Sequence, residues 1–503
     1  MSDSRGDGDR AAFVEYGIED RPPLGESILL GLQHYLTMVG ANIAVPLILA
    51  GAMGMPADVT ARFVGTFFVV SGVATLAQTT LGNRYPIVQG APFSMLAPAL
   101  AIIAVVGSLP GQPDWQTALV HLQGAIIAAA LVQVAIGYLG LIGRLRRFLS
   151  PVVIAPTIAL IGLALFDAPQ ITAADQDWWL LGLTVGLIVL FSQYLNARSR
   201  AFQLFPVILG MAIVWLLAAL LSIWGVYTPD SPGYVDLASV ADAPALMAIY
   251  PFQWGLPRFE FALAIGMVAG VLASIVESFG DYQAVARLTG SGAPSERRIN
   301  HGIGMEGLMN VFSGVMGTGG STSYSENIGA IGLTGVASRY VVQVGALCML
   351  VAGFVGYFGQ LVATIPEPII GGLFVAMFGQ IVAVGISTLK HVDLDSQRNV
   401  FVVGFSLFVG LAIPQYMANV GSAQDFRELA AGVAPVLGSP IVADTVFVIG
   451  GTGMAVGGLV ALVLDNTIPG TREERGLEEW EKRTEDDAEF ESAWERFRGR
   501  SAD

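Results

Sequence analysis

Residues Gly317–Gly335, GTGGSTSYSENIGAIGLTG, form a polar, glycine-rich stretch between long apolar segments. These flanks place the stretch at the depth of a lipid bilayer, yet it is too polar for an ordinary spanning helix. Irregular backbone is tolerated at that depth only where protein or a water-filled cavity covers it, and an ionisable residue there is by default a functional-site hypothesis. Glu326, in the middle of the stretch, therefore predicts a functional site that the rest of the chain supports.

The composition indicates a polytopic membrane protein. Of the 503 residues, 54% are hydrophobic and 13% are charged, whereas soluble proteins carry about 25% charged residues; the mean hydropathy is +0.64. The single Cys348 lies in an apolar run and the four histidines are scattered, so we expect no disulfide framework, no metal site and no cofactor. The net charge of −15 argues against nucleic acid as a partner. It favours a halophilic protein, although an acidic C-terminal tail alone would also explain it.

Apolar runs predict the membrane segments, since a span requires roughly 20 such residues. Two segments, 86–107 and 320–335, read as broken spans, and the count with the full spans is fourteen. The full spans are predicted near 28–51, 60–81, 116–141, 148–166, 178–196, 205–226, 259–282, 299–316, 338–362, 368–388, 397–416 and 442–465. An even count puts both termini on one side, and the arginine-rich loops make that side the cytoplasm of a plasma-membrane protein. The N-terminus lacks an apolar signal region, so we expect no cleaved signal.

A faint internal repeat relates the two halves. The first span begins near Ile28 and the eighth near Phe259, an offset of 231 residues that brings Gln89 onto residue 320. The two broken segments therefore match, and so do the proline-rich openings of the fifth and twelfth spans. Seven segments per half is an odd number, so the halves run in opposite directions. Broken helices at matching places in inverted repeats predict a substrate site at the bilayer midplane.

Several residues in these segments could carry chemistry. Each broken segment ends in a half-helix whose first N–H groups are free to bind a ligand. Ser94 and Ser325 have the residue type of N-caps for these half-helices, and Phe93 could stack on a planar ligand.

Ionisable residues in apolar spans are costly unless they pair or face a wet cavity. Glu277 and Asp281 are four residues apart and hence on one helix face, and Glu306 and His34, with Gln33, also lie in predicted spans. Removal from water disfavours a charged carboxylate, so such a group can carry a coupling proton. Asp281 could instead meet solvent or a nearby arginine. Glu306, His34 and Gln33 could equally be hydrogen-bond partners between helices.

Two stretches of the sequence partly match nucleotide-binding motifs of enzymes, but neither match is complete in its context. Gly302–Gly307 fits G-x-G-x-x-G but follows no strand, and GTGGST lacks the lysine of a phosphate-binding loop. The chain has neither a G-x-S-x-G nucleophile nor an H-E-x-x-H zinc pair. We therefore predict no catalytic residue and no enzymatic activity.

The segment from Glu326 to Gly335 resembles the signature of the nucleobase–ascorbate transporter family (nucleobase:cation symporter 2, the uracil and xanthine permeases). The pattern [QEP]-N-x-G-x-x-x-x-T-[RKG] is complete, with Asn327, Gly329 and Thr334 at its fixed positions. It is supported by Gln33-His34, by Gln89-Gly90 and by ESFGDYQAVARL from Glu277, and the similarity runs from about Tyr16 to Asn466.

This resemblance implies an all-α membrane protein of fourteen segments in two inverted seven-segment repeats. Segments 3 and 10 would contain short antiparallel strands that cross at the centre. A core domain, 28–142 with 259–362, would hold the substrate, and a gate domain, 143–258 with 363–466, would often make a homodimer contact. The tails, 1–27 and 467–503, are expected to be cytoplasmic. Apolar residues among the acids of the C-terminal tail could form an amphipathic helix on the protein, but we expect a solvated, partly disordered tail, so removing residues 475–503 should leave uptake intact.

The resemblance also implies roles for individual residues. Glu277 and Glu326 would bind nucleobase N–H groups, and the backbone near Phe93 and Ser325 would bind the carbonyls. Asp281 would serve proton coupling, although uracil-transporting bacterial relatives carry histidine there, and Glu306 matches a carboxylate of the eukaryotic purine branch. The expected substrate-binding set is Glu277, Glu326, Phe93, Ser94, Ser325 and Asn327. The expected coupling network is Asp281, Glu306, His34, Gln33 and Thr334.

The predicted function is proton-coupled import of uracil or a xanthine-type purine by elevator-like alternating access. Sodium coupling and the identity of the base stay open. Ascorbate transporters of the family carry proline in place of Glu326, and a carboxylate would repel anionic ascorbate. Anion carriers of the same overall fold usually add a cytoplasmic domain of full size, roughly 100 residues or more, and would need cationic side chains at the site. A channel or a receptor is a further alternative.

Overall fold

Long apolar helices form most of the part of the chain that the computed structural model describes, which is residues 14–109, 114–145 and 148–477. In this part, six helices are long and apolar enough to cross a membrane, or up to eight if each of two bent helix pairs is one span. Four shorter apolar helices accompany them. Residues 1–13 and 478–503 of the two predicted tails lie outside the described residues.

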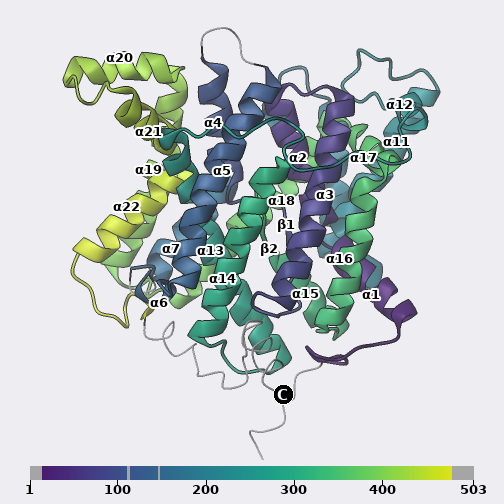
Figure 1. Cartoon of the computed structure of the whole chain (residues 1–503), viewed down its shortest axis with the longest axis horizontal. Coiled ribbons are helices and arrows are strands. Elements are labelled where there is room, and N and C mark those ends of the chain that lie inside the picture. Colours follow the sequence, from purple (N-terminus) through teal and green to yellow (C-terminus); the bar gives the residue numbers. More distant parts are fainter. Residues whose placement is uncertain (1–13, 110–113, 146–147, 478–503) are drawn as a thin grey trace, which may run out of the picture.

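The first half of the chain contains one short strand among its helices (Figure 1). Its elements are α1 (Leu24–Leu36), α2 (Val39–Met53), α3 (Ala57–Thr80), β1 (Gln89–Gly90), α4 (Leu96–Gly107), α5 (Trp115–Tyr138), α6 (Ile142–Leu145), α7 (Pro151–Leu163), α8 (Pro169–Thr172), α9 (Trp178–Val189), the π-helix η1 (Leu190–Tyr194), α10 (Arg200–Leu204), α11 (Pro206–Ile223) and α12 (Leu237–Ala241).

The second half follows a similar plan. Its elements are α13 (Phe261–Thr289), α14 (Glu296–Met316), β2 (Thr322–Ser323), α15 (Ser325–Thr334), α16 (Arg339–Phe354), α17 (Gly356–Ala363), α18 (Glu367–Thr388), the 3₁₀ turn η2 (Leu389–His391), α19 (Gln397–Val420), α20 (Ala423–Val433), α21 (Pro440–Gly450) and α22 (Gly453–Thr467). In Figure 1, α1 lies at the lower right of the molecule, whereas α12 lies at the upper right and α20 at the upper left.

Three spans predicted as continuous are interrupted. The span near 28–51 bends by 47° between α1 and α2, and the span near 442–465 bends by 94° between α21 and α22. The span near 338–362 breaks at Val355, because an incoming loop takes its backbone bonds: Met247 N donates to Phe354 O at 2.8 Å. Helix α20 was not expected at all. These predictions failed because apolar composition does not reveal where a helix is broken.

The helices divide into two packed groups. In the first group, α14 packs on α5, α16 packs on α3 and on α1, and α13 packs on α5. In the second group, α18 packs on α7 and α9, and α22 packs on α7 and α19. The first group contains both strands, and the cavity described below lies between it and the second group.

Paired glycines allow close crossings within the first group. A Cβ on Gly31 of α1 would lie 2.7 Å from the backbone nitrogen of Gly345 on α16, and a Cβ on Gly345 would lie 2.6 Å from Gly31 O. Helices in membranes associate through such small residues, since there is no hydrophobic gain between apolar surfaces in lipid. These crossings fix the scaffold around the strands.

The residues before α1 form a strap along the end of α15. Ala337 N donates to Tyr16 O at 2.8 Å, and Arg339 N donates to Ile18 O at 3.1 Å. Glu19 forms ion pairs with Arg84 at 2.9 Å and with Arg339 at 2.5 Å. The described part of the predicted N-terminal tail is therefore attached to the first group.

A buried carboxylate, Asp465 of α22, anchors the residues after the last helix. Asp465 pairs with Arg398 at 2.9 Å and with Arg475 at 2.7 Å, and Ser150 Oγ donates to it at 2.7 Å. Residues up to 477 of the predicted C-terminal tail are therefore attached to the helices, and a deletion from 475 would remove Arg475 from this cluster. The Ser396 hydroxyl also donates to Glu474 and holds the pKa of that carboxyl below its ordinary value.

Candidate substrate site between two broken segments

The strands β1 and β2 bring together residues that are far apart in the sequence. They pair antiparallel, with Gln89 opposite Ser323 and Gly90 opposite Thr322. Each strand lies within one of the two segments predicted to be broken. A side chain at Gly90 would not fit, since a Cβ there would lie 2.7 Å from Met38 Cε and 3.1 Å from Asn42 Oδ1.

Side chains from surrounding helices satisfy the backbone of the broken segments. Asn42 Oδ1 accepts from Ala91 N at 3.0 Å, and Asn327 Oδ1 accepts from Val88 N at 3.0 Å. Thr75 Oγ1 accepts from Gln89 N at 2.9 Å, and Asn310 Oδ1 accepts from Ser321 N at 2.6 Å. Backbone groups without a partner are costly at this depth, so these polar side chains make the irregular segments possible.

The N-terminal ends of both half-helices are free of side-chain caps. The residue that caps α4 is Met95, and the residue that caps α15 is Tyr324, neither with a side-chain hydrogen bond. The prediction that Ser94 and Ser325 are caps is therefore wrong. Ser325 donates to Asp281 Oδ1 at 2.6 Å instead, and Ser94 is buried away from the cavity lining. The uncapped first turns keep backbone N–H groups available to a ligand.

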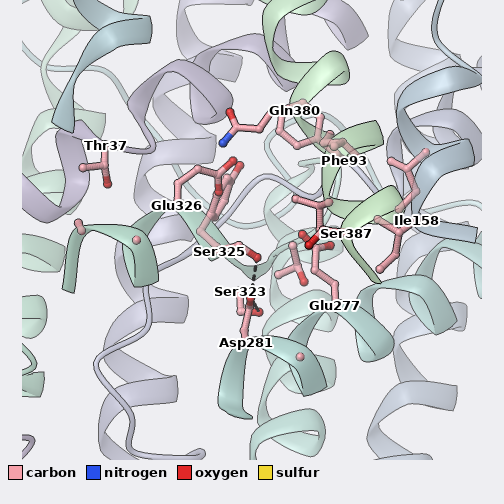
Figure 2. A pocket seen from close by; sticks show the side chains of 18 of the residues that line it. Thr37, Phe93, Ile158, Glu277, Asp281, Ser323, Ser325, Glu326, Gln380 and Ser387 are labelled. Carbon is pink, nitrogen blue, oxygen red and sulfur yellow. Dashed lines mark hydrogen bonds between the residues drawn. The ribbon is translucent and has the colours of Figure 1, made fainter. Parts of the chain in front are cut away.

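A cavity of about 580 Å³ lies against these junctions (Figure 2). The strand region contributes Phe93, Ser325 and Glu326, and α13 contributes Glu277 and Asp281. The opposite wall is mostly aliphatic and comes from α7, α11 and α18. The volume suits a small organic ligand, because ligand pockets measure roughly 300–1,000 Å³ and combine an apolar lining with a few polar groups.

Three carboxylates line this cavity, and they differ in the hydrogen bonds that they accept. Asp281 is buried and accepts hydrogen bonds from Ser323 Oγ at 2.5 Å and Ser325 Oγ at 2.6 Å. Glu277 and Glu326 make no hydrogen bond to another side chain in the described ranges. The two glutamates therefore have acceptor atoms available for N–H groups of a ligand, while Asp281 is committed to the β2–α15 junction.

A chain of hydroxyls connects Asp281 to a fourth carboxylate, Glu306. Ser278 Oγ lies 2.6 Å from Glu306 Oε2 and 2.9 Å from Ser323 Oγ, which in turn bonds Asp281. Gln133 Nε2 donates to Glu306 Oε1 at 2.9 Å. Glu306 is fully buried and does not line the cavity, so it lies behind the site.

The remaining predicted residues support the site from outside the cavity. Asn327, predicted to bind substrate, is buried behind β1, where Nδ2 donates to His34 Nδ1 at 2.9 Å. Both its amide atoms have partners, so the structure does not place it at the cavity wall. Thr334 Oγ1 donates to Ala330 O at 2.8 Å near the end of α15. Gln33 is half-buried on α1 and does not reach the lining.

Sequence reasoning missed most of the supporting residues. These are Asn42, Ser71, Thr75, Gln133, Ser274, Ser278, Asn310 and Ser323. One signal was available, because polar side chains inside apolar spans need partners. Ser274 and Ser278, four residues apart, both bond Glu306 and illustrate that signal.

Known proteins are similar to this chain along nearly its whole length. Residues 25–419 match the profile of the permease family Xan_ur_permease. Solute carrier family 23 member 2 of Homo sapiens is 42% identical over 511 residues, which cover 93% of this chain and 76% of that protein. Nucleobase-ascorbate transporter 1 of Arabidopsis thaliana is 34% identical over 492 residues, covering 93% of this chain and 92% of that protein.

Solved structures with a similar fold are more distant in sequence. The transmembrane domain of the cyanobacterial bicarbonate transporter BicA has a TM-score of 0.55 at 16% identity and covers 79% of this chain and 98% of its own. SLC26A9 also has a TM-score of 0.55, at 13% identity, and covers 78% of this chain and 63% of its own. At such identities the likeness concerns the fold alone.

Proposed function

This chain belongs to the Xan_ur_permease family together with solute carrier family 23 and the plant nucleobase-ascorbate transporters, and is therefore a membrane transporter; from that premise we propose that it imports a nucleobase, xanthine or uracil. The observation that carries the proposal is the cavity in which Glu277 and Glu326 present unused carboxylate oxygens beside two uncapped half-helices. Carboxylates accept N–H groups, and backbone N–H groups donate to carbonyls. A nucleobase carries both kinds of group on one planar ring.

The aromatic and aliphatic walls support a planar ligand. Phe93 lines the cavity next to the strand pair, where its ring can cover the face of a base. The opposite wall offers Ile154 and Ile158 of α7, which exclude water from the other face. We propose that Glu277, Glu326, Phe93 and the backbone at Ser325 form the substrate contacts.

We propose a division into a core and a gate that move relative to each other. The core would be residues 28–142 and 259–362, the gate 143–258 and 363–466, and their fourteen segments would include the two broken ones. The position of the cavity between the two helix groups supports elevator-like alternating access. The cavity reaches the C-terminal ends of α13 and α18, where Arg287 and Lys390 line it; by the positive-inside rule this end would face the cytoplasm, as would both termini.

Proton coupling is proposed from the hydroxyl chain behind the site. Asp281 lies between the cavity and the Ser323–Ser278–Glu306 chain. Binding of a neutral base to Glu277 and Glu326 would change the proton occupancy of Asp281 and Glu306, the two carboxylates that the hydroxyl chain connects. The gate would also make the dimer contact, which the exposed Phe401, Phe405 and Phe408 of α19 support.

Uptake into proteoliposomes tests the proposal. Labelled xanthine and uracil are offered under a proton gradient or a sodium gradient, with wild type and Glu326→Gln. We expect proton-driven uptake of one base, which the variant loses because the amide no longer offers two acceptors to the ligand. Sodium-driven uptake would keep the site and replace the coupling ion. Absence of uptake of both bases would refute the proposed substrate class.

Ascorbate is a second candidate substrate, since the plant relatives are named for it. The cationic side chains of Arg287 and Lys390 at one end of the cavity favour an anion. The carboxylate of Glu326 beside the strands opposes it. Labelled ascorbate in the same proteoliposomes separates the two candidates.

A further inference from the structure

The gate-side wall of the cavity contains a polar side chain whose role the family motifs do not address. Helix α18 lines the cavity with Gln380, Ile381, Val384, Ser387 and Thr388. Ser387 and Thr388 lie about 10 Å further along the helix than Gln380, given a rise of about 1.5 Å per residue. Gln380 is therefore the first polar group that α18 presents on the approach from the strand end of the cavity.

An aromatic contact between α18 and the segment after β1 fixes the position of Gln380 relative to the strands. Phe378, two residues earlier on α18, packs edge-to-face on Phe93, with ring centroids 5.9 Å apart and planes at 90°. Phe93 lies three residues before the start of the α4 half-helix and lines the same cavity. Gln380 thus lies within one helical turn of a residue that touches the proposed stacking ring.

The carboxamide of Gln380 is exposed to the cavity and points across it toward Glu326 (Figure 2). Within residues 14–109, 114–145 and 148–477, it forms no hydrogen bond. A primary amide carries one acceptor oxygen and one donor nitrogen in a single plane. Gln380 and Glu326 line the same cavity and neither is hydrogen-bonded to another side chain within the described ranges, so one ligand can contact both groups.

We propose that Gln380 is a specificity-determining residue that binds the substrate from the gate side. Its carboxamide selects a ring edge on which an N–H stands beside a carbonyl, as in the lactam of a nucleobase. Glu326 holds the same ligand from the core side, so the ligand contacts both domains at once. These contacts can form together only when core and gate lie close, so the bound ligand stabilises that arrangement. This inference rests on the proposed function and names the part of the ligand that is recognised.

Binding of methylated bases to the purified full-length protein tests the inference. Dissociation constants of xanthine and of 1-, 3-, 7- and 9-methylxanthine are measured for wild type, Gln380→Met, Gln380→Asn and the control Thr388→Val. Methionine has a similar length and removes both hydrogen bonds, whereas asparagine keeps the amide on a shorter side chain. Thr388→Val changes a polar residue on the same face of α18, further along the cavity. If wild type binds uracil instead, the same series is run with methyluracils.

We expect Gln380→Met to raise the dissociation constant of the unmethylated base about 3- to 10-fold, which is the range for one or two neutral hydrogen bonds. It should also abolish the penalty that wild type shows for methylation at one ring position, and leave the penalties at the other positions unchanged. Gln380→Asn should retain part of that penalty, and Thr388→Val should match wild type. Equal penalties at every position in wild type and Gln380→Met would overturn the role of Gln380 while leaving the proposed function intact. A folded wild type that binds no base at all would overturn both.

Discussion

Replacing Asn327 by alanine tests the claim that side chains support the broken backbone. The Asn327 side chain accepts from Val88 N at 3.0 Å and donates to His34 Nδ1 at 2.9 Å, and all three residues are buried. Alanine leaves the Val88 N–H without a partner, at a cost of about 1–3 kcal/mol. Loss of the bond to His34 adds about 0.6 kcal/mol and at most about 1.7 kcal/mol, as for other polar pairs between membrane helices. The expected destabilisation is therefore about 2–5 kcal/mol, most of it from the backbone group.

The assay is reversible unfolding of the purified protein in mixed micelles with increasing dodecyl sulfate. It gives the difference in the free energy of unfolding between each variant and wild type. Asn327→Asp keeps an acceptor for Val88 and should cost less than Asn327→Ala. The control is Asn419→Ala, at an exposed position of α19 whose amide forms no hydrogen bond within the described ranges, and it should change stability by less than about 0.5 kcal/mol. Binding of the base should weaken in Asn327→Ala, because β1 flanks the cavity. If Asn327→Ala is as stable as the control, the proposed support of the strand by this side chain is refuted.

Three further changes probe other features. Asp465→Ala removes one side of a buried ion-pair cluster and should destabilise the protein by about 3–5 kcal/mol in the same unfolding titration; wild-type stability would show that the cluster is dispensable. Gly345→Val forces a side chain against the facing backbone of α1 and should cost about 1–3 kcal/mol or abolish membrane abundance, whereas Gly182→Ala, with open space at its Cβ, should be neutral or slightly stabilising. Ser278→Ala interrupts the hydroxyl chain from Glu306, so proton-driven accumulation of base should fall while its dissociation constant changes less than threefold; unchanged accumulation would exclude this chain as a coupling route.

Three residues of the cavity wall could be inferred from the sequence, whereas several breaks in the helices could not. Glu277, Asp281 and Glu326 could be found because ionisable residues in apolar or broken spans are rare and need a reason. The positions of Ser94 and Asn327 could not be found, because their orientation depends on how the two halves dock. The break at Val355 left no signal, since the interrupting loop comes from elsewhere in the chain, and the bend after Leu36 was missed as well. Gln380 was missed because a single amide in a mostly apolar helix resembles many residues at helix contacts.

The pairing of β1 with β2 has a consequence for how the protein is made. Gln89 and its partner Ser323 are separated by 234 positions along the chain. A ribosome that adds about 5–20 residues per second needs roughly 12 to 47 s to travel from one to the other. During that interval the first strand is already synthesised, while its backbone partner does not yet exist. The nascent first half must therefore keep this segment hydrogen-bonded to its own polar side chains or to water, and the binding site is assembled only as the final third of the protein emerges.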